Sequence, residues 1–253
     1  MLRGDRLNSA IIVAAGSGKR MNIDINKQFI RLDNKEIVAH TIEVFYKNKN
    51  IDEIVVCVKE EEEEFFKKHI IQKYKFKNVK VVKGGDERQD SIYNGLKQIS
   101  KECKVVLIHD GARPFIEDEI INESIEIAKI KKAVVVGVPV KDTIKIVSNE
   151  KIEQTPERSM LWAAQTPQTF EYNIIMKAYK EAYKNNYYGT DDSMLVENIN
   201  QEVTMIMGSN ENIKITTPED ISIAEQILKV RKEREELKKK SKSNNKGKIR
   251  RII

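Results

Sequence analysis

The feature that most constrains the fold is a regular alternation of short β-branched apolar runs with longer stretches of helical character. We expect the runs to be strands, at 10–15, 53–58, 79–83, 104–109, 133–138 and 203–207. We expect the stretches between them to be helices, near 36–47, 60–74, 88–100, 117–130 and 171–184. Such alternation is typical of βαβ units, and continuous apolar strands are typical of a sheet buried on both faces. The sequence therefore predicts an α/β protein with a mainly parallel sheet and helices on both faces.

Charge is distributed unevenly along the chain. The whole sequence has 45 Lys and Arg against 39 Asp and Glu, a net charge of +6. Residues 229–253 hold 12 basic and 3 acidic residues, which leaves 33 basic and 36 acidic residues, a net charge of −3, for 1–228. We therefore expect one domain over 1–228, followed over 229–253 by a helix end and a disordered basic tail. Such a tail is either a solvated extension, the interpretation we favour, or an arm that binds nucleic acid or another anionic surface.

Three further observations bear on the cellular location of the protein. Cys57 and Cys103 lie in apolar runs, as isolated buried thiols do, which favours a reducing compartment. No Cys or His pair has zinc spacing, and no apolar run approaches the roughly 20 residues that span a membrane. The first residues lack the apolar core of a signal peptide. We expect a cytoplasmic protein that does not contact a membrane.

The turn after the first expected strand carries the strongest chemical signal. Residues 10–21 read AIIVAAGSGKRM, so an apolar run leads into small residues, two glycines and two cations, and Lys27 follows closely. Small residues let a ligand approach the backbone, and the free N–H groups and cations suit a polyphosphate. The spacing fits neither the Walker loop nor the dinucleotide fingerprint, which would need a glycine at Met21. A basic strand-to-helix turn without a ligand is the alternative.

Residues 139–168 interrupt the alternation. Three prolines punctuate this segment, and a hairpin is expected from 143–147 and 151–155. A long excursion from a compact domain is usually functional or contacts a partner. After it, Thr217 and Pro218 predict the start of a final helix.

Five polar clusters fall at strand ends or in loops, where open α/β sheets bind ligands. They are residues 14–27, 84–91, 109–114, 142–168 and 212–216. Each has an ordinary structural explanation, such as a turn, a helix cap or a surface ion pair. Together they supply five cations near one predicted sheet edge, Arg20, Lys27, Arg113, Arg158 and Lys214. Asp110 adds the hard oxygen ligand that a magnesium–phosphate complex needs.

At these residues the chain resembles the methylerythritol-phosphate cytidylyltransferases of isoprenoid precursor synthesis. The ordered set of shared motifs runs from about Ala10 to Leu228. The motifs are Ala14-Ala15-Gly16-x-Gly18-x-Arg20-Met21, Lys27-Gln28-Phe29, Gly84-Gly85-x-x-Arg88-x-x-Ser91, His109-Asp110-x-Ala112-Arg113-Pro114, Asp142-Thr143, Arg158-x-x-Leu161-Trp162-x-x-Gln165-Thr166-Pro167-Gln168, Thr190-Asp191-Asp192 and Asn212-Ile213-Lys214.

The resemblance implies a Rossmann-like fold and a nucleotidyltransferase that moves CMP from CTP to 2-C-methyl-D-erythritol 4-phosphate and releases pyrophosphate. It implies that CTP is held by Ala14, Ala15, Gly16, Gly18, Gly85, Asp86 and Ser91. It implies catalytic roles for Arg20, Lys27 and Lys214, and an Mg²⁺ cofactor held in part by Asp110. It implies that the alcohol phosphate is bound by Asp110, Arg113, Thr143, Arg158 and Thr166. In this family the excursion is a β-hairpin arm that clasps a second subunit, so a homodimer is expected, in which Arg158 serves either its own site or the partner's.

Three alternatives belong to other activities. A related cytidylyltransferase acting on ribitol 5-phosphate shares several motifs, but the Ala14–Gly16 turn and Arg158 with Leu161-Trp162 favour the methylerythritol enzyme. A protein that binds nucleic acid through the basic tail would lose its affinity for nucleic acid at high salt. A nicotinamide dehydrogenase is disfavoured by the missing third glycine of the fingerprint and by the extra cations.

Overall fold

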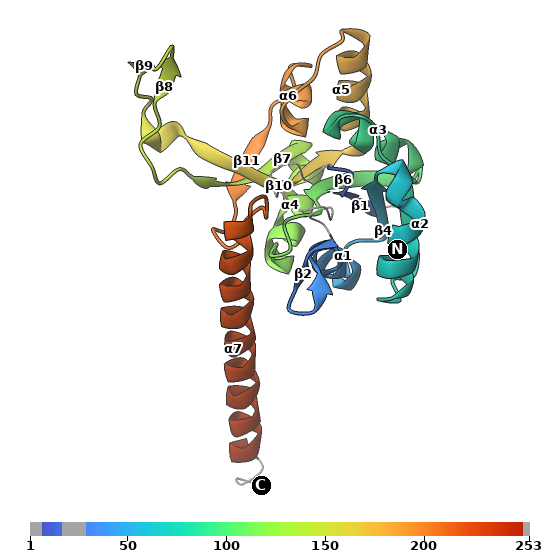
Figure 1. Ribbon diagram of the computed structural model, residues 1–253, viewed down its shortest axis with the longest axis vertical. Coiled ribbons are helices and arrows are strands. Elements are labelled where there is room, and N and C mark those ends of the chain that lie inside the picture. The colour runs from blue at the N-terminus through green and yellow to red at the C-terminus, as the bar shows by residue number, and fades with distance from the viewer. Residues whose placement is uncertain (1–6, 17–28, 250–253) are drawn as a thin grey trace.

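A seven-stranded sheet forms the centre of the protein (Figure 1). The structure is a computed structural model that describes residues 7–16 and 29–249, with side chains through Leu237. The sheet strands are β1 (Leu7–Val13), β4 (Glu53–Val58), β5 (Val79–Lys83), β6 (Cys103–Asp110), β7 (Ala133–Pro139), β10 (Trp162–Glu171) and β11 (Thr204–Met207). The α-helices are α1 (Ile37–Lys47), α2 (Glu63–Phe66), α3 (Arg88–Gln98), α4 (Asp118–Lys131), α5 (Tyr172–Lys184), α6 (Asp192–Glu197) and α7 (Pro218–Ile249). Short pieces complete the chain: the β2 (Arg31–Leu32) and β3 (Lys35–Glu36) ribbon, η4 (Glu60–Glu62), η5 (Lys67–Gln72) and η6 (Arg158–Met160).

The strand order is β11-β7-β10-β6-β1-β4-β5. Strand β10 runs antiparallel to both of its neighbours, and all other neighbouring pairs are parallel. The predicted α/β class and mainly parallel sheet are therefore confirmed. The chain leaves β1 for β4 on one side and later adds β6 on the other, so the strand order reverses at β1. Such a reversal opens a crevice at the carboxyl ends of the strands.

Alternate residues of the central strands pack into two different cores, which explains the continuous apolar runs in these strands. In β1, Ala10 and Ile12 pack with α1, η5 and α4, whereas Ile11 packs with α3, α5 and α6 on the other face. In β4, Val56 and Val55 divide in the same way. The period-2 geometry of a strand sends neighbours to opposite faces, so both faces need apolar side chains.

Strand β10 is the element that the sequence pattern did not predict. Its middle carries Gln165, Thr166, Pro167 and Gln168, which break an apolar run, and its pairing with β7 shifts between Ala164 and Gln168. The three polar side chains are nevertheless buried and hydrogen-bonded, Gln165 and Gln168 to loops beside the sheet and Thr166 to His109 of β6. A strand that contains polar residues with such contacts lacks the apolar pattern from which strands are predicted.

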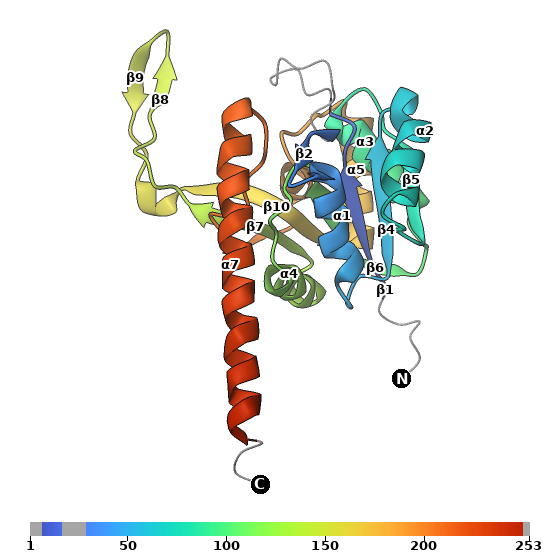
Figure 2. The same cartoon turned by 60° about the horizontal axis from the view of Figure 1, so that its bottom comes forward.

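The predicted hairpin is present and projects from the body (Figures 1 and 2). It pairs β8 (Ile146–Ser148) with β9 (Lys151–Gln154). The excursion is shorter than the predicted 139–168, because 162–168 belong to β10 in the central sheet. Five apolar side chains between the two sheet strands are exposed, Ile144, Ile146, Val147, Ile152 and Met160.

The C-terminal region carries a long helix that covers most of the predicted tail, and the predicted division of the chain at residue 228 stays a prediction. Helix α7 begins at Pro218 as predicted, continues to Ile249 and extends well beyond the body (Figure 1). Lys, Arg, Glu and Leu are good helix formers, and the segment after Pro218 contains no further proline. Its first turns pack on the body through Ala224, Ile227 and Leu228. Neither α7 nor any other helix within the described residues combines the length and apolar character that crossing a membrane requires.

Candidate active site

A pocket of about 590 Å³ lies where the strand order reverses, at the carboxyl ends of β1, β4, β5 and β6. Four turns that follow these strands, together with a loop before α7, form its wall. The lining residues are Val13, Ala14, Ala15, Gly16, Lys59, Glu60, Glu61, Gly84, Gly85, Asp86, Glu87, Arg88, Ser91, Asp110, Ala112 and Lys214. The structure thus brings together eight predicted site residues from four separate clusters, namely Ala14, Ala15, Gly16, Gly85, Asp86, Ser91, Asp110 and Lys214. Gly18, Arg20 and Lys27 lie outside the described residues.

The turn after β5 is closely packed against the turn after β1. A Cβ atom on Gly84 would lie 2.7 Å from Cβ of Ala15 and 2.8 Å from Oγ of Ser91, so only glycine fits there. The Ser91 hydroxyl accepts the N–H of Gly85 at 3.0 Å and lies 3.1 Å from the carbonyl oxygen of Glu87. Ser91 is almost fully buried, and it therefore fixes the shape of the turn that lines the pocket.

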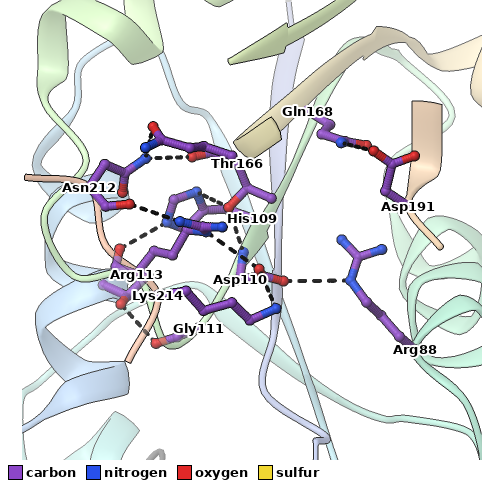
Figure 3. Close-up of polar contacts among 12 residues, drawn as sticks. Arg88, His109, Asp110, Gly111, Arg113, Thr166, Gln168, Asp191, Asn212 and Lys214 are labelled. Atoms are coloured by element: carbon purple, nitrogen blue, oxygen red, sulfur yellow. Dashed lines mark hydrogen bonds and ion pairs between the residues drawn. The ribbon is translucent and has the colours of Figure 1, made fainter. Parts of the chain in front are cut away.

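Asp110, the last residue of β6, is the centre of the charged wall (Figure 3). Its Oδ2 lies 2.8 Å from Nζ of Lys214 and 3.5 Å from Nε of Arg113, and its Oδ1 lies 3.5 Å from Nε of Arg88. Burial acts to raise the pKa of Asp110, but the charges of Arg88, Lys214 and Arg113 outweigh it and hold this pKa well below its usual range. The carboxylate stays ionised, and three cations surround it.

A buried network behind the pocket fixes the backbone of Asp110. Nε2 of His109 lies 3.0 Å from the carbonyl oxygen of Arg113, which can only accept, so Nε2 carries the proton. Nδ1 of His109 then accepts the hydroxyl of Thr166 at 3.1 Å, and that hydroxyl accepts the N–H of Asp110 at 3.1 Å. Burial lowers the pKa of His109 to about 4, so its ring is neutral at physiological pH. Thr166, predicted to bind substrate, has its hydroxyl committed to this network.

The loop that carries Lys214 is attached to the same network. The Arg113 guanidinium donates to the carbonyl oxygen of Asn212 at 2.8 Å, and the Asn212 side chain donates to the carbonyl oxygen of Thr166 at 2.9 Å. Arg113 is therefore mostly buried beside the pocket and does not line it. One residue before Asn212, Glu211 is ion-paired with α7 through Arg231 at 2.8 Å. The loop that carries Lys214 is thus held by Arg113, Thr166 and α7.

The arm places two predicted substrate-binding residues away from this pocket. Thr143 and Arg158 are exposed, and neither lines it. A guanidinium N–H of Arg158 donates to the carbonyl oxygen of Lys141 within the arm, at 3.1 Å. The structure of one chain therefore separates these two residues from Asp110 and Lys214.

Two lining cations were not among the predicted site residues, Lys59 and Arg88. Arg88 was visible in the sequence as part of the Gly84-Gly85-x-x-Arg88-x-x-Ser91 motif, but no role was assigned to it. It is the first residue of α3, and besides Asp110 it contacts Asp192 at 2.8 Å. Lys59 follows directly after β4, and its position at the end of that strand was the one sequence feature that could have marked it as a site residue.

The donor set around Asp110 fits a magnesium ion that arrives with a triphosphate. No three His, Cys, Asp or Glu side chains of the described residues cluster tightly enough to hold a metal by themselves. Mg²⁺ usually binds through one or two carboxylates together with substrate phosphates. Asp110 provides an ionised carboxylate whose Oδ1 has, among the residues that the structure describes, only the long contact with Arg88.

Comparisons with known proteins agree with this geometry. The family model IspD, 2-C-methyl-D-erythritol 4-phosphate cytidylyltransferase, matches residues 9–230. The enzyme of that name from Clostridioides difficile is 74% identical over 224 residues, which cover 88% of this chain and 94% of the relative. The one from Alkaliphilus oremlandii is 54% identical and covers 89% and 96%. The crystal structure of 4-diphosphocytidyl-2C-methyl-D-erythritol synthase from Anaerococcus prevotii matches with a TM-score of 0.79 at 34% identity, over 89% of this chain and 97% of that one. The chain belongs to the 2-C-methyl-D-erythritol 4-phosphate cytidylyltransferase family.

Proposed function

We propose that this protein transfers CMP from CTP to 2-C-methyl-D-erythritol 4-phosphate in isoprenoid precursor synthesis. A phosphate oxygen of the alcohol attacks the α-phosphorus of CTP and forms a new P–O bond. The bond from the α-phosphorus to the oxygen shared with the β-phosphate breaks, and pyrophosphate leaves with the electron pair. The attacking phosphate is already anionic, so the reaction needs no general base. This agrees with the neutral, buried His109, which hydrogen bonds hold behind the pocket.

The observation that carries the proposal is the convergence of Lys214, Arg88 and Arg113 on Asp110 beside the glycine-rich turns. Two anions must meet in this reaction, and each pair of unit charges near 4 Å costs roughly 4 kcal/mol at an effective dielectric constant of 20. Cations fixed in advance offset this repulsion and stabilise the charge that develops on the α-phosphate. Arg88 and Lys214 line the pocket and are held by ion pairs before any substrate binds.

The roles of the other residues follow from their place in the pocket. The backbone of Ala14, Ala15, Gly16 and Gly85 would hold CTP, together with Asp86 and Ser91, which also line the pocket. Asp110 would bind Mg²⁺ together with the phosphates, and the ion would neutralise part of the triphosphate charge. Lys214 would meet the phosphate of the alcohol, and the predicted contact of Arg113 with that phosphate stays a prediction because Arg113 lies beside the pocket. Predicted roles for Gly18, Arg20 and Lys27 at the triphosphate, and the predicted cytoplasmic location, stay predictions.

We further propose a homodimer joined through the 140–161 arm. The arm exposes Ile144, Ile146, Val147, Ile152 and Met160 on an isolated hairpin. A two-stranded hairpin is marginally stable in water by itself, so covering these side chains with a second subunit would stabilise it. In such a dimer Thr143 and Arg158 would reach the alcohol in the partner's pocket.

The test is pyrophosphate release from CTP and Mg²⁺ by the purified protein. Methylerythritol phosphate, ribitol 5-phosphate and a sugar 1-phosphate are compared as acceptors at equal concentration. We expect turnover with methylerythritol phosphate to exceed the other two by about 10²-fold or more, because the site must position the attacking oxygen closely. Equal or faster turnover with ribitol 5-phosphate would contradict the proposed substrate.

A further inference from the structure

A chain of ion pairs leads from the pocket to a carboxylate that lies outside it. Nε of Arg88 is 3.5 Å from Oδ1 of Asp110, and Nη2 of Arg88 is 2.8 Å from Oδ2 of Asp192. Asp192 is the first residue of α6, is 1% exposed and does not line the pocket. We infer that Asp192 is a positioning residue for the transfer reaction, because it restrains Arg88 so that Lys214 keeps its place on Asp110.

Several contacts from separate elements fix Asp192. Its Oδ1 accepts the hydroxyl of Tyr179, on α5, at 2.5 Å. Its backbone N–H donates to Oε1 of Gln168, on β10, at 3.0 Å. Burial and the neighbouring Asp192 carboxylate both raise the pKa of Tyr179, so its hydroxyl stays protonated and remains a donor. The position of the Asp192 carboxylate is therefore set by the fold independently of the pocket.

The distances show which carboxylate holds Arg88 more closely. The contact with Asp192 is at hydrogen-bonding distance, whereas the contact with Asp110 is longer than a hydrogen bond. Lys214 is at hydrogen-bonding distance from Asp110. Arg88 is therefore paired more closely with Asp192 than with Asp110, and Lys214 is the close partner of Asp110.

Charge explains what the loss of Asp192 would do. The two carboxylates of Asp110 and Asp192 face three cations, so the cluster carries one net positive charge. Without the charge of Asp192, Arg88 would have Asp110 as its one remaining carboxylate in the cluster. A guanidinium binds a carboxylate best through two parallel N–H donors, and such a pair on Asp110 would compete with Lys214 for Oδ2. Lys214 would then leave the position in which it meets the reacting phosphates.

The experiment compares Asp192→Asn with Tyr179→Phe in the full chain, with both substrates saturating. Asp192→Asn removes the charge and keeps the shape, and we expect kcat to fall about tenfold or more while KM for CTP changes less than about threefold. Tyr179→Phe removes a buried hydrogen bond to the same carboxylate and keeps its charge, so it should lower the melting temperature and leave kcat within about twofold. Asp192→Glu, which retains the charge, should recover most of the lost kcat.

A double-mutant cycle isolates the route through Arg88. Arg88→Met alone is compared with the double variant, Arg88→Met combined with Asp192→Asn. The double variant removes both partners of the ion pair and therefore leaves neither charge buried and unpaired. It keeps the test decidable if Asp192→Asn alone does not fold. Since Asp192 acts through Arg88, the second substitution should cause no further loss of kcat. A further tenfold loss in the Arg88→Met background would overturn the inference. The inference would also be overturned if Asp192→Asn and Tyr179→Phe lowered kcat in the same proportion as they lowered the melting temperature. The inference rests on the proposed function, and an unmodified protein that releases no pyrophosphate would instead contradict that function.

Discussion

Nζ of Lys214, in the loop before α7, lies 2.8 Å from Oδ2 of Asp110 at the end of β6. The contact joins two segments far apart in the sequence and places the lysine on the wall of the pocket. Lys214 is held in part by a carboxylate that also faces the pocket. An ammonium held in this way is positioned before substrate arrives, which is the condition for electrostatic catalysis.

Lys214→Met should lower kcat by about 10²-fold, the scale for the loss of one preorganised donor. The substitution keeps an unbranched side chain that is one atom shorter and removes its charge, so the loop should keep its place through Asn212. The measurement is steady-state pyrophosphate release with both substrates varied. Lys68→Met is the matched control, because Lys68 is exposed and does not line the pocket. A loss of less than about threefold at Lys214 would remove it from the catalytic residues.

Replacing Thr166 separates a structural role from substrate binding. Thr166→Val removes the hydroxyl that joins His109 to the N–H of Asp110 and leaves both groups without that partner. Unsatisfied buried groups cost about 1–3 kcal/mol each, so the free energy of unfolding in urea should fall by that order. Thr166→Ser keeps the hydroxyl and should remain close to the wild type. If Thr166→Val left stability unchanged and raised only KM for the alcohol, the hydroxyl would act on substrate instead.

His109 should stay neutral over a wide pH range. Its pKa is about 4 in the folded protein against an ordinary value of 6.5, mainly because of burial. Between these values the unfolded chain binds a proton that the folded chain does not. Stability is therefore lost as pH falls from 6.5 toward 4, by up to about 3 kcal/mol. In NMR titration, the imidazole signal of His109 should hardly move above pH 5, and the same signal in urea-unfolded protein should titrate near 6.5. A folded-state midpoint near 6.5 would contradict the buried neutral network.

The sequence predicted those parts of the fold and site whose chemistry is local. Strands such as β1 and β4 carry continuous apolar runs because both of their faces are buried, and the residues at the carboxyl end of β1 entered the pocket as expected. Strand β10 was missed, because its buried polar side chains serve loops beside the sheet rather than a core. The link between Arg88 and Asp192 was beyond the sequence for a different reason. It joins two helix starts that only the folded chain brings together, and no spacing along the chain encodes it.

Truncation should distinguish two parts of α7. A chain ending at Leu237 keeps Arg231 and Arg234, whose side chains pair with Glu211 in the loop of Lys214, and should retain full kcat. A chain ending at Leu228 loses both pairs, and we expect a lower melting temperature and weaker catalysis, since partly exposed pairs contribute up to about 1 kcal/mol each. Circular dichroism and pyrophosphate release measure both. The same two chains test the nucleic-acid alternative, which requires nucleic-acid binding that weakens steeply with salt and is lost on truncation after Leu228.

Arg158 offers a test of the arm across the proposed dimer. Arg158→Ala should mainly raise KM for the alcohol, because in the proposed dimer its guanidinium, which is exposed and does not line the pocket of its own chain, would reach the alcohol in the partner's pocket. Mixing Arg158→Ala subunits with Lys214→Met subunits decides which pocket it serves. If it serves the partner's pocket, each mixed dimer has one pocket with Lys214 from its own chain and Arg158 from the other. Random exchange should then restore about a quarter of wild-type activity at low alcohol concentration. Exchange that restores nothing, with dimers verified by light scattering, would place Arg158 at the site of its own subunit.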